Sequence, residues 1–313
     1  MNTGHILLIV NPVSGKMKSR SGLFDILDEL YRTPDGSPAE DRRVTVCTTL
    51  YRGHATELAT TAHQEGFAHV VCCGGDGTLN EVLNGLLATP ADTRPTLGYI
   101  PAGSTNDFAS SIGLPSALRS AAKTAGWGNI SPLDIGLFCP AENPDGRYFS
   151  YIASFGAFTE TSYSTSQSIK NAMGHMAYIL SSIRDLSKIT ARHLTVDTAD
   201  GTHLEGDYIF GAMSNTTSAG GVVKLPADRV SMNDGEMEVF LIRSPHSHIE
   251  LSKIIFSLLS MNYTDNPMID FLHASEARFA FAEPTSWSLD GEEAAGGTEV
   301  NIRCLPGSVR LCL

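Results

Sequence analysis

Basic residues and long apolar runs are scarce in this sequence. Its 22 Lys and Arg stand against 34 Asp and Glu, which gives a net charge of −12. This balance argues against broad binding to nucleic acid, because phosphate backbones are bound by clustered cations. The uncharged apolar stretches near 171–183 and 254–264 are shorter than the roughly 18–20 residues of a membrane-spanning helix. The apolar run Ile6–Val10 has no basic flank before it, so no signal peptide is expected.

Metal-type cysteine motifs and the common nucleotide-binding signatures are also missing. The six cysteines show no CxxC pairing, and Cys72 and Cys73 end an apolar run that is typical of buried thiols. His246-Ser247-His248 has no cysteine partner, so a solvated turn before a helix is favoured over a metal site. Neither a P-loop ending in Gly-Lys-Ser/Thr nor a GxGxxG fingerprint is present. We expect a reduced, cytoplasmic protein.

Residues 1–130 alternate short apolar runs with helix-like segments of roughly ten residues. Alternation of this kind predicts an α/β domain, in which helices cover both faces of a parallel sheet. The expected strands are His5–Val10, Arg43–Thr48, His69–Cys73 and Thr96–Ile100, and the expected helices are Ser19–Tyr31, His54–Glu65 and Thr78–Leu87.

The pattern changes after Gly126 to alternating segments separated by turns, which predict a β-rich antiparallel sandwich. Charge changes as well, from 10 basic and 12 acidic residues in 1–130 to 12 and 22 in 131–313. We therefore predict two domains, 1–130 and 131–313, and leave open whether the last strands return to the first. Two helices are expected near 169–189 and 249–261. The expected strands are Leu133–Phe138, Tyr148–Phe155, His193–Asp197, Asp207–Met213, Glu236–Ile242, Arg278–Ala282, Thr285–Leu289 and Glu299–Cys304.

Three polar, glycine-containing loops follow strands of the predicted parallel sheet: Asn11–Lys16, Gly74–Thr78 and Pro101–Asp107. The carboxyl ends of parallel strands share one edge of a sheet, where α/β proteins bind ligands. Glycines let the backbone approach a phosphate, and the start of the following helix offers N–H groups. The three loops together predict one nucleotide-phosphate cleft.

The aspartate inside the second loop, Asp76, would repel a bare phosphate. Its presence therefore suggests a bridging divalent cation, with a tight Asp-Gly turn as the simpler alternative. Lys16 in the first loop fits pairing with a phosphate, and it fits a solvated loop lysine equally well.

These loops carry a resemblance to a known family. Asn-Pro-x-Ser-Gly from Asn11, Gly-Gly-Asp-Gly-Thr-x-Asn-Glu from Gly74 and Pro-x-Gly-Ser-x-Asn-Asp-Phe-Ala from Pro101 resemble the diacylglycerol kinase catalytic-domain family, which includes bacterial lipid kinases and sphingosine kinases. The resemblance spans nearly the whole chain, because further matching segments stand in the expected order: Phe155-Gly156, Gly174–Tyr178, Asn233–Gly235 and Leu289–Glu292.

The resemblance implies a magnesium-dependent kinase that transfers phosphate from ATP to a lipid hydroxyl. Asp76 matches the aspartate near ATP and its magnesium, and Glu292 matches the proposed general base, which takes the proton of the lipid hydroxyl. Without the family context, Glu292 would be interpreted as a surface acid in a hairpin. Ser104 replaces a common threonine. The residues that the resemblance places at the nucleotide are Asn11, Ser14, Gly15, Lys16, Thr49, Gly74, Gly75, Asp76, Gly77, Thr78, Leu79, Asn80, Gly103, Ser104 and Asn106.

Bacterial members also resemble one another in a structural magnesium site. Leu225, Asp228 and Val230 keep its spacing, with two of the ligands expected to be backbone carbonyls. The sequence departs from the pattern at Pro226, which lies two residues before the aspartate, and by one extra residue before Asn233–Gly235. A plain acidic loop is the alternative.

A lipid substrate implies contact with a membrane surface. The segment 165–195 carries four basic residues against one acidic residue, together with several apolar side chains. We hypothesise that it docks on anionic lipid or forms an acyl-chain entrance, with a packed core helix as the alternative. The acidic excess elsewhere predicts that this contact is transient, so the protein is expected to be peripheral at the membrane. A homodimer is left open.

Two other functions remain as alternatives. NAD kinase shares the Gly-Gly-Asp-Gly-Thr loop, although the continuation Leu79–Gly85 fits lipid kinases better. A non-catalytic nucleotide- or lipid-binding regulator is disfavoured by the intact Asp76 and Glu292. The lipid itself is undetermined, because diacylglycerol, phosphatidylglycerol, a sphingoid base and a polyprenol-like lipid all present a primary hydroxyl.

Overall fold

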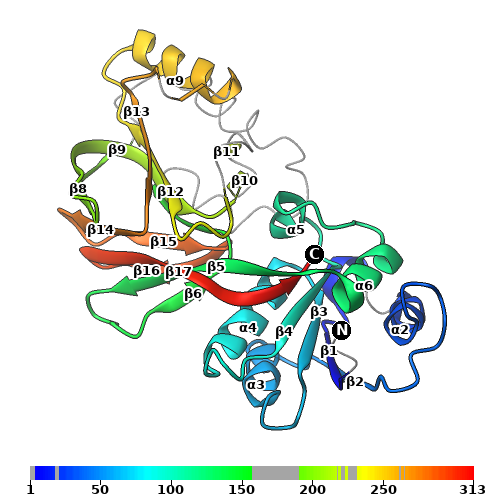
Figure 1. The fold of residues 1–313 in the computed structure, drawn as a ribbon. Coiled ribbons are helices and arrows are strands. Elements are labelled where there is room, and N and C mark those ends of the chain that lie inside the picture. The colour runs from blue at the N-terminus through cyan, green and yellow to red at the C-terminus, as the bar shows by residue number, and fades with distance from the viewer. Residues whose placement is uncertain are drawn as a thin grey trace. The chain divides into compact units, whose positions relative to one another are not determined.

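The structure is a computed structural model, shown in Figure 1. It describes residues 4–17, 21–156, 190–216, 218–219, 223–224, 231–260, 262–263 and 265–313. The chain divides into two compact units, one formed by Met1–Leu133 with Gly307–Leu313 and the other by Asp134–Pro306. The end of the chain thus returns to the first unit, which the sequence left open.

A parallel sheet forms the centre of the first unit. Its strands are ordered β2-β1-β3-β4-β17, and all neighbouring pairs run parallel. Every residue of β1, β3 and β4 is buried, as expected for strands with both faces covered. The bounds are Ile6–Val10 for β1, Val44–Thr48 for β2, His69–Gly74 for β3, Thr96–Pro101 for β4 and Glu299–Cys312 for β17.

Helices cover both faces of this sheet, as predicted. Figure 1 shows α3 (His54–Thr61) and α4 (Asp76–Leu87) on one side, and α2 (Leu23–Tyr31) and α6 (Leu118–Trp127) on the other. A short α5 (Asp107–Ser111) and a 3-10 turn, η1 (Ser14–Met17), complete the unit. Helix α4 turns one apolar face inward, because Leu79, Val82, Leu83 and Leu86 are all buried.

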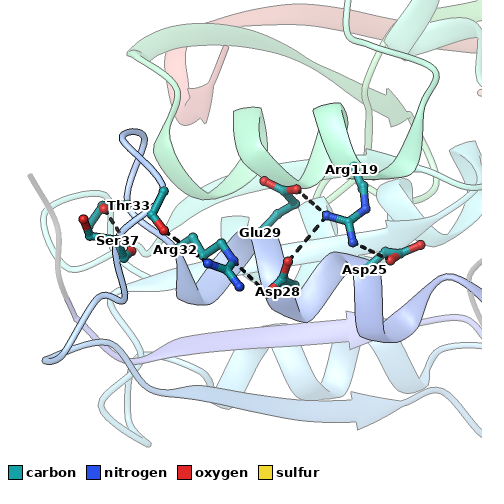
Figure 2. A network of polar contacts seen from close by, with 8 residues as sticks. Asp25, Asp28, Glu29, Arg32, Thr33, Ser37 and Arg119 are labelled. Atoms are coloured by element: carbon teal, nitrogen blue, oxygen red, sulfur yellow. Dashed lines mark hydrogen bonds and ion pairs between the residues drawn. The ribbon is translucent and has the colours of Figure 1, made fainter.

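Helices α2 and α6 are joined by exposed ion pairs, shown in Figure 2. Arg119 of α6 contacts Asp25 at 2.7 Å, Glu29 at 2.9 Å and Asp28 at 3.4 Å on α2. Arg32 contacts Asp28 at 2.8 Å. Because water and salt compete with exposed pairs, the network orders the two helices more than it stabilises them.

The second unit is β-rich and antiparallel. Its sheet runs in the order β16-β15-β7-β9-β8-β14-β17, β12 joins β9 and β13, and β6 joins β5. Helix α9 (His248–Ser260) buries Leu251, Ile254 and Leu258. The bounds are Ile130–Pro140 for β5, Arg147–Phe149 for β6, Ile152–Gly156 for β7, Arg192–Thr198 for β8, His203–Ser214 for β9, Ser218–Ala219 for β10, Val223–Lys224 for β11, Met237–Arg243 for β12, Ile269–Ala274 for β13, Glu276–Phe281 for β14, Ser286–Leu289 for β15 and Glu292–Ala295 for β16.

An aromatic cluster around Trp287 forms the centre of the core of this unit. The indole is fully buried, and its ring centre lies 4.8 to 6.0 Å from four phenylalanine rings, mostly in edge-to-face arrangements that suit aromatic quadrupoles. The four rings belong to Phe138, Phe155, Phe279 and Phe281, which come from β5, β7 and β14. The cluster therefore ties three strands to the β15–β16 hairpin.

Several sequence-based expectations need correction. Tyr148–Phe155 was expected to be one strand, but it is two, β6 and β7. Helix α6 was missed because its buried residues are mostly alanines, which give a weak apolar period. Helix α5 and strand β13 were missed as well. The helix expected at 169–189 lies outside the described residues.

Among the described helices, none combines the length and hydropathy required to cross a bilayer. All six cysteines are free thiols.

Removal of the central indole should destabilise the protein strongly. We expect Trp287→Ala to cost about 3–5 kcal/mol of unfolding free energy, because it leaves a large cavity among four aromatic rings. The control Phe24→Ala removes a ring that is 85% exposed, and it should stay within about 0.5 kcal/mol of wild type. Urea unfolding followed by circular dichroism measures both, and equal midpoints would contradict the assignment of this core.

Candidate nucleotide and catalytic site

The three predicted loops meet at the carboxyl edge of the parallel sheet in the first unit. The N–H of Asn11, just after β1, donates to the carbonyl of Cys73 on β3 at 2.9 Å. The N–H of Ala102, just after β4, donates to the carbonyl of Gly74 at 2.8 Å. The sheet hydrogen-bond pattern thus continues past the strand ends, so the loops start in a fixed register.

The loops pack backbone against backbone, and this requires glycine. A Cβ on Gly103 would lie 2.5 Å from the Cα of Gly75. A Cβ on Gly15 would lie 1.9 Å from the carbonyl oxygen of Ala102, and Gly15 also has a φ of +52°. At these contacts backbone lies directly against backbone, an arrangement in which glycine N–H groups can approach a ligand closely.

Asp76 is the first residue of α4, and its carboxylate lies at the start of α5. It accepts hydrogen bonds from the N–H of Asp107 at 3.2 Å and of Phe108 at 3.4 Å, and from the Thr105 hydroxyl at 3.5 Å. These N–H groups belong to the first turn of α5, where backbone donors have no partner within the helix. Asp76 therefore positions the third loop, a role that the sequence analysis did not identify.

Glu81, in the same motif, caps a second helix. Its carboxylate accepts from the N–H of Gly53 at 2.9 Å and of Ala55 at 3.2 Å, at the start of α3. Its backbone carbonyl accepts from the hydroxyl of Thr56 at 3.0 Å. The sequence analysis did not assign Glu81 to the site, although a carboxylate next to a phosphate loop was a usable signal.

Other predicted residues hold the loops in shape. The side-chain amide of Asn11 donates to the hydroxyl of Thr78 at 3.0 Å, which connects the first loop to the second. The amide oxygen of Asn106 accepts from the N–H of Gly103 at 2.8 Å, and its φ of 54° places it in the left-handed region. Leu79 and Asn80 are buried in α4, whereas Ser104 is exposed.

The remaining residues that were predicted to contact the nucleotide lie at the same sheet edge. The N–H of Thr49, directly after β2, donates to the carbonyl of Val10 at 2.9 Å, so Thr49 follows the same sheet edge. Ser14 and Gly77 belong to the loops already described, and only the backbone of Lys16 is described, in η1. Burial raises the pKa of Asp107, the first residue of α5, which the sequence analysis did not select.

The second unit carries Glu292 at the start of β16, directly after a tight hairpin turn. Asp290 and Gly291 have φ values of 51° and 86°, the two left-handed residues of a type I′ turn. Gly291 meets this requirement at no steric cost, and aspartate is among the few other residues that tolerate it. This hairpin agrees with the simpler interpretation of Glu292 as an acid in a hairpin. The position of Glu292 is also restricted by contacts around the turn.

The turn is anchored by the side chain of Asp290. The carboxylate accepts hydrogen bonds from the N–H groups of Ser150 at 2.6 Å, Tyr151 at 3.0 Å and Ile152 at 3.1 Å, and from the Ser150 hydroxyl at 2.8 Å. These donors are taken out of the strand ladder, which explains why β6 and β7 are separate. Burial raises the pKa of Asp290, and the hydrogen bonds from the N–H groups oppose that shift.

Glu292 forms an ion pair with Arg147 of β6, with 2.7 Å between Oε2 and Nη2. The two side chains are 30% and 34% exposed, so both remain accessible to solvent. Asp76 and Glu292 belong to different units.

The predicted structural metal ligands Leu225, Asp228 and Val230 lie outside the described residues, so their arrangement stays a prediction. Within the part of the chain that the structure describes, no group of three or more His, Cys, Asp and Glu side chains is arranged to bind a metal ion.

An α/β unit with glycine loops gathered at one sheet edge, combined with an antiparallel β-rich unit, defines a two-domain protein with a nucleotide-binding domain. Residues 5–138 match the diacylglycerol kinase catalytic domain. Residues 154–313 match the YegS C-terminal NAD kinase beta sandwich-like domain. The chain belongs to the diacylglycerol kinase family, a family of lipid kinases.

Individual relatives agree with this assignment. A diacylglycerol kinase of Bacillus subtilis is 31% identical over 286 residues, which cover 91% of this chain and 88% of the relative. A solved diacylglycerol kinase structure from Bacillus anthracis superposes with a TM-score of 0.70 at 21% identity, covering 99% of this chain and 96% of the other. An NAD kinase from Archaeoglobus fulgidus in complex with ATP has a TM-score of 0.52 at 12% identity, covering 98% and 93%. The last two similarities show the fold alone.

The loop packing can be tested with two glycines that share a left-handed backbone. We expect Gly15→Ala to cost about 2–3 kcal/mol or more, because strain and a backbone clash act together. Gly36→Ala is the matched control, with a φ of +90° and nothing within 4 Å of the added Cβ, and it should cost only about 1 kcal/mol. Chemical unfolding gives both values. An equal loss in the two variants would show that the loops do not require this close approach.

Proposed function

We propose that the protein is an ATP- and magnesium-dependent lipid kinase that transfers the γ-phosphate to a lipid hydroxyl. The observation that carries this proposal is the close backbone packing of three glycine loops, the third of which is held by the Asp76 carboxylate. Phosphoryl transfer depends mainly on positioning and on neutralisation of phosphate charge, and such a rigid backbone site serves both needs.

Within the first unit, the loop residues would bind the phosphates through backbone N–H groups. The first turn of α4 supplies N–H groups without partners inside the helix, together with the positive end of the helix dipole. Thr49, Ser104 and the other predicted residues of this sheet edge would contact the nucleotide around the phosphates.

Asp76 is the residue that fits a magnesium ion. Its hydrogen bonds to the start of α5 are 3.2 to 3.5 Å long, and a carboxylate has lone pairs beyond those that three donors use. When bound, magnesium would neutralise charge on the phosphates of ATP. Because Asp76 also orders the third loop, loss of the carboxylate would affect the nucleotide site in two ways.

Glu292 would act as the general base in the second unit. A carboxylate can accept the proton of the attacking hydroxyl, provided that it is ionised and aimed at that hydroxyl. Its place after a two-residue turn anchored by Asp290 limits its movement. The lipid substrate implies that the protein contacts a membrane surface, in keeping with peripheral association.

The two carboxylates can be tested with matched neighbours. We expect Asp76→Asn and Glu292→Gln each to lower lipid phosphorylation by about 100-fold or more, since general base catalysis alone contributes roughly 10²–10⁴-fold. The controls Asp92→Asn and Glu293→Gln change exposed acids and should leave the rate unchanged. The measurement is transfer of labelled phosphate from ATP to a total-lipid extract. A variant at either site that is folded and fully active would refute the role proposed for that residue.

NAD kinase activity is the second candidate, because the second unit matches an NAD kinase beta sandwich-like domain. We expect labelled phosphate to enter lipid, whereas NAD should be phosphorylated at a rate at least about 100-fold lower. Magnesium dependence is read in the same assay by adding EDTA, which should stop transfer, and then restoring the metal. Preferential labelling of NAD would replace the lipid kinase assignment. Nucleotide binding without turnover on either substrate would favour a regulator.

A further inference from the structure

The ion pair between Arg147 and Glu292 joins residues far apart in the sequence. Arg147 lies on β6 and Glu292 on β16. Nη2 of Arg147 donates to Oε2 of Glu292 at 2.7 Å. Neither the motifs nor the family resemblance selected Arg147 as part of the site. Its guanidinium nevertheless lies directly on the carboxylate that is proposed to take a proton.

Both partners are attached to rigid backbone. Arg147 pairs with Phe138 across the β5–β6 ladder, and Phe138 packs on Trp287 in the core. Glu292 pairs with Leu289 across the β15–β16 hairpin, and the turn between them is anchored through Asp290. Little backbone freedom therefore remains to be lost when the pair forms.

A second arginine–glutamate pair in the same unit provides a comparison. Arg278 of β14 contacts Glu299 of β17 at 2.6 Å, but the two side chains are 53% and 40% exposed. That pair lies on adjacent strands and has no connection to an anchored turn. Both pairs therefore join a guanidinium to a carboxylate. The Arg278–Glu299 pair is more exposed, and only the carboxylate of Glu292 has a proposed catalytic role.

We propose that Arg147 is a positioning residue for the reaction, which holds the Glu292 carboxylate in one orientation. This inference rests on the proposed function of Glu292 as the general base. A guanidinium donates along fixed directions, so its contact with Oε2 restricts rotation of the carboxylate.

The two acids beside Glu292 in the sequence cannot replace Arg147 as a donor. Asp290 in the turn directs its carboxylate to the N–H groups of Ser150–Ile152. Glu293 follows on β16, where successive side chains point to opposite faces of the strand. Both are acids, so neither donates to the Glu292 carboxylate as the Arg147 guanidinium does.

The test compares kcat and KM for lipid phosphorylation in Arg147→Met, Arg147→Lys and the control Arg278→Met. We expect Arg147→Met to lose about tenfold in kcat with KM for the lipid near the wild-type value, because the carboxylate is no longer held in one orientation while the lipid still binds. Arg147→Lys should recover part of this loss and remain several-fold slower than wild type, because lysine supplies charge without the fixed geometry. Arg278→Met should match wild type in both respects.

The outcomes separate this inference from the proposed function. If Glu292→Gln is inactive but folded Arg147→Met keeps the wild-type kcat, the inference is wrong and the general base stands. If Glu292→Gln is as active as wild type, the general-base role fails and the inference fails with it. Thermal unfolding of each variant shows whether it is folded. Should Arg147→Met not fold, Arg147→Lys decides, since a wild-type kcat in that variant would overturn the inference.

Discussion

The contact between the backbones of Gly75 and Gly103 is the constraint on which the nucleotide domain depends. Two loops from neighbouring strands approach so closely that a single Cβ on Gly103 would lie 2.5 Å from the Cα of Gly75. Gly15 of the first loop packs beside this contact, because a Cβ on it would lie 1.9 Å from the carbonyl oxygen of Ala102. Because no side chain fits at the centre, the surface there is made of backbone, and its N–H groups are available to a phosphate at short range.

In both units, buried or partly buried carboxylates accept hydrogen bonds from backbone N–H groups. Asp76 caps α5, Glu81 caps α3 and Asp290 accepts three N–H groups at the start of β7. In each case an acid from a motif that the sequence analysis singled out accepts hydrogen bonds from backbone donors at the end of a helix or strand. Residues that a family comparison associates with chemistry therefore also determine local structure, so their loss affects both geometry and charge.

The α/β and β-rich classes were predictable because apolar periodicity in 1–130 and alternation after Gly126 are local signals. The three loops were predictable for the same reason, since each directly follows an apolar strand. Helix α6 was not, because its buried face consists of alanines. The break between β6 and β7 was not predictable either, because it depends on Asp290, which lies about 140 residues further along the chain.

The sequence by itself determined the class of each domain, the family, and the glycine and acidic residues of the motifs, because these follow from local pattern and residue type. The scarcity of cations likewise argued against nucleic acid as a partner. Only the tertiary structure decided which groups those residues contact. Glu292 forms an ion pair with Arg147, and Asp76 accepts hydrogen bonds from N–H groups at the start of α5. Such pairings depend on strand order and on the path of the chain, which no local pattern in a single sequence encodes.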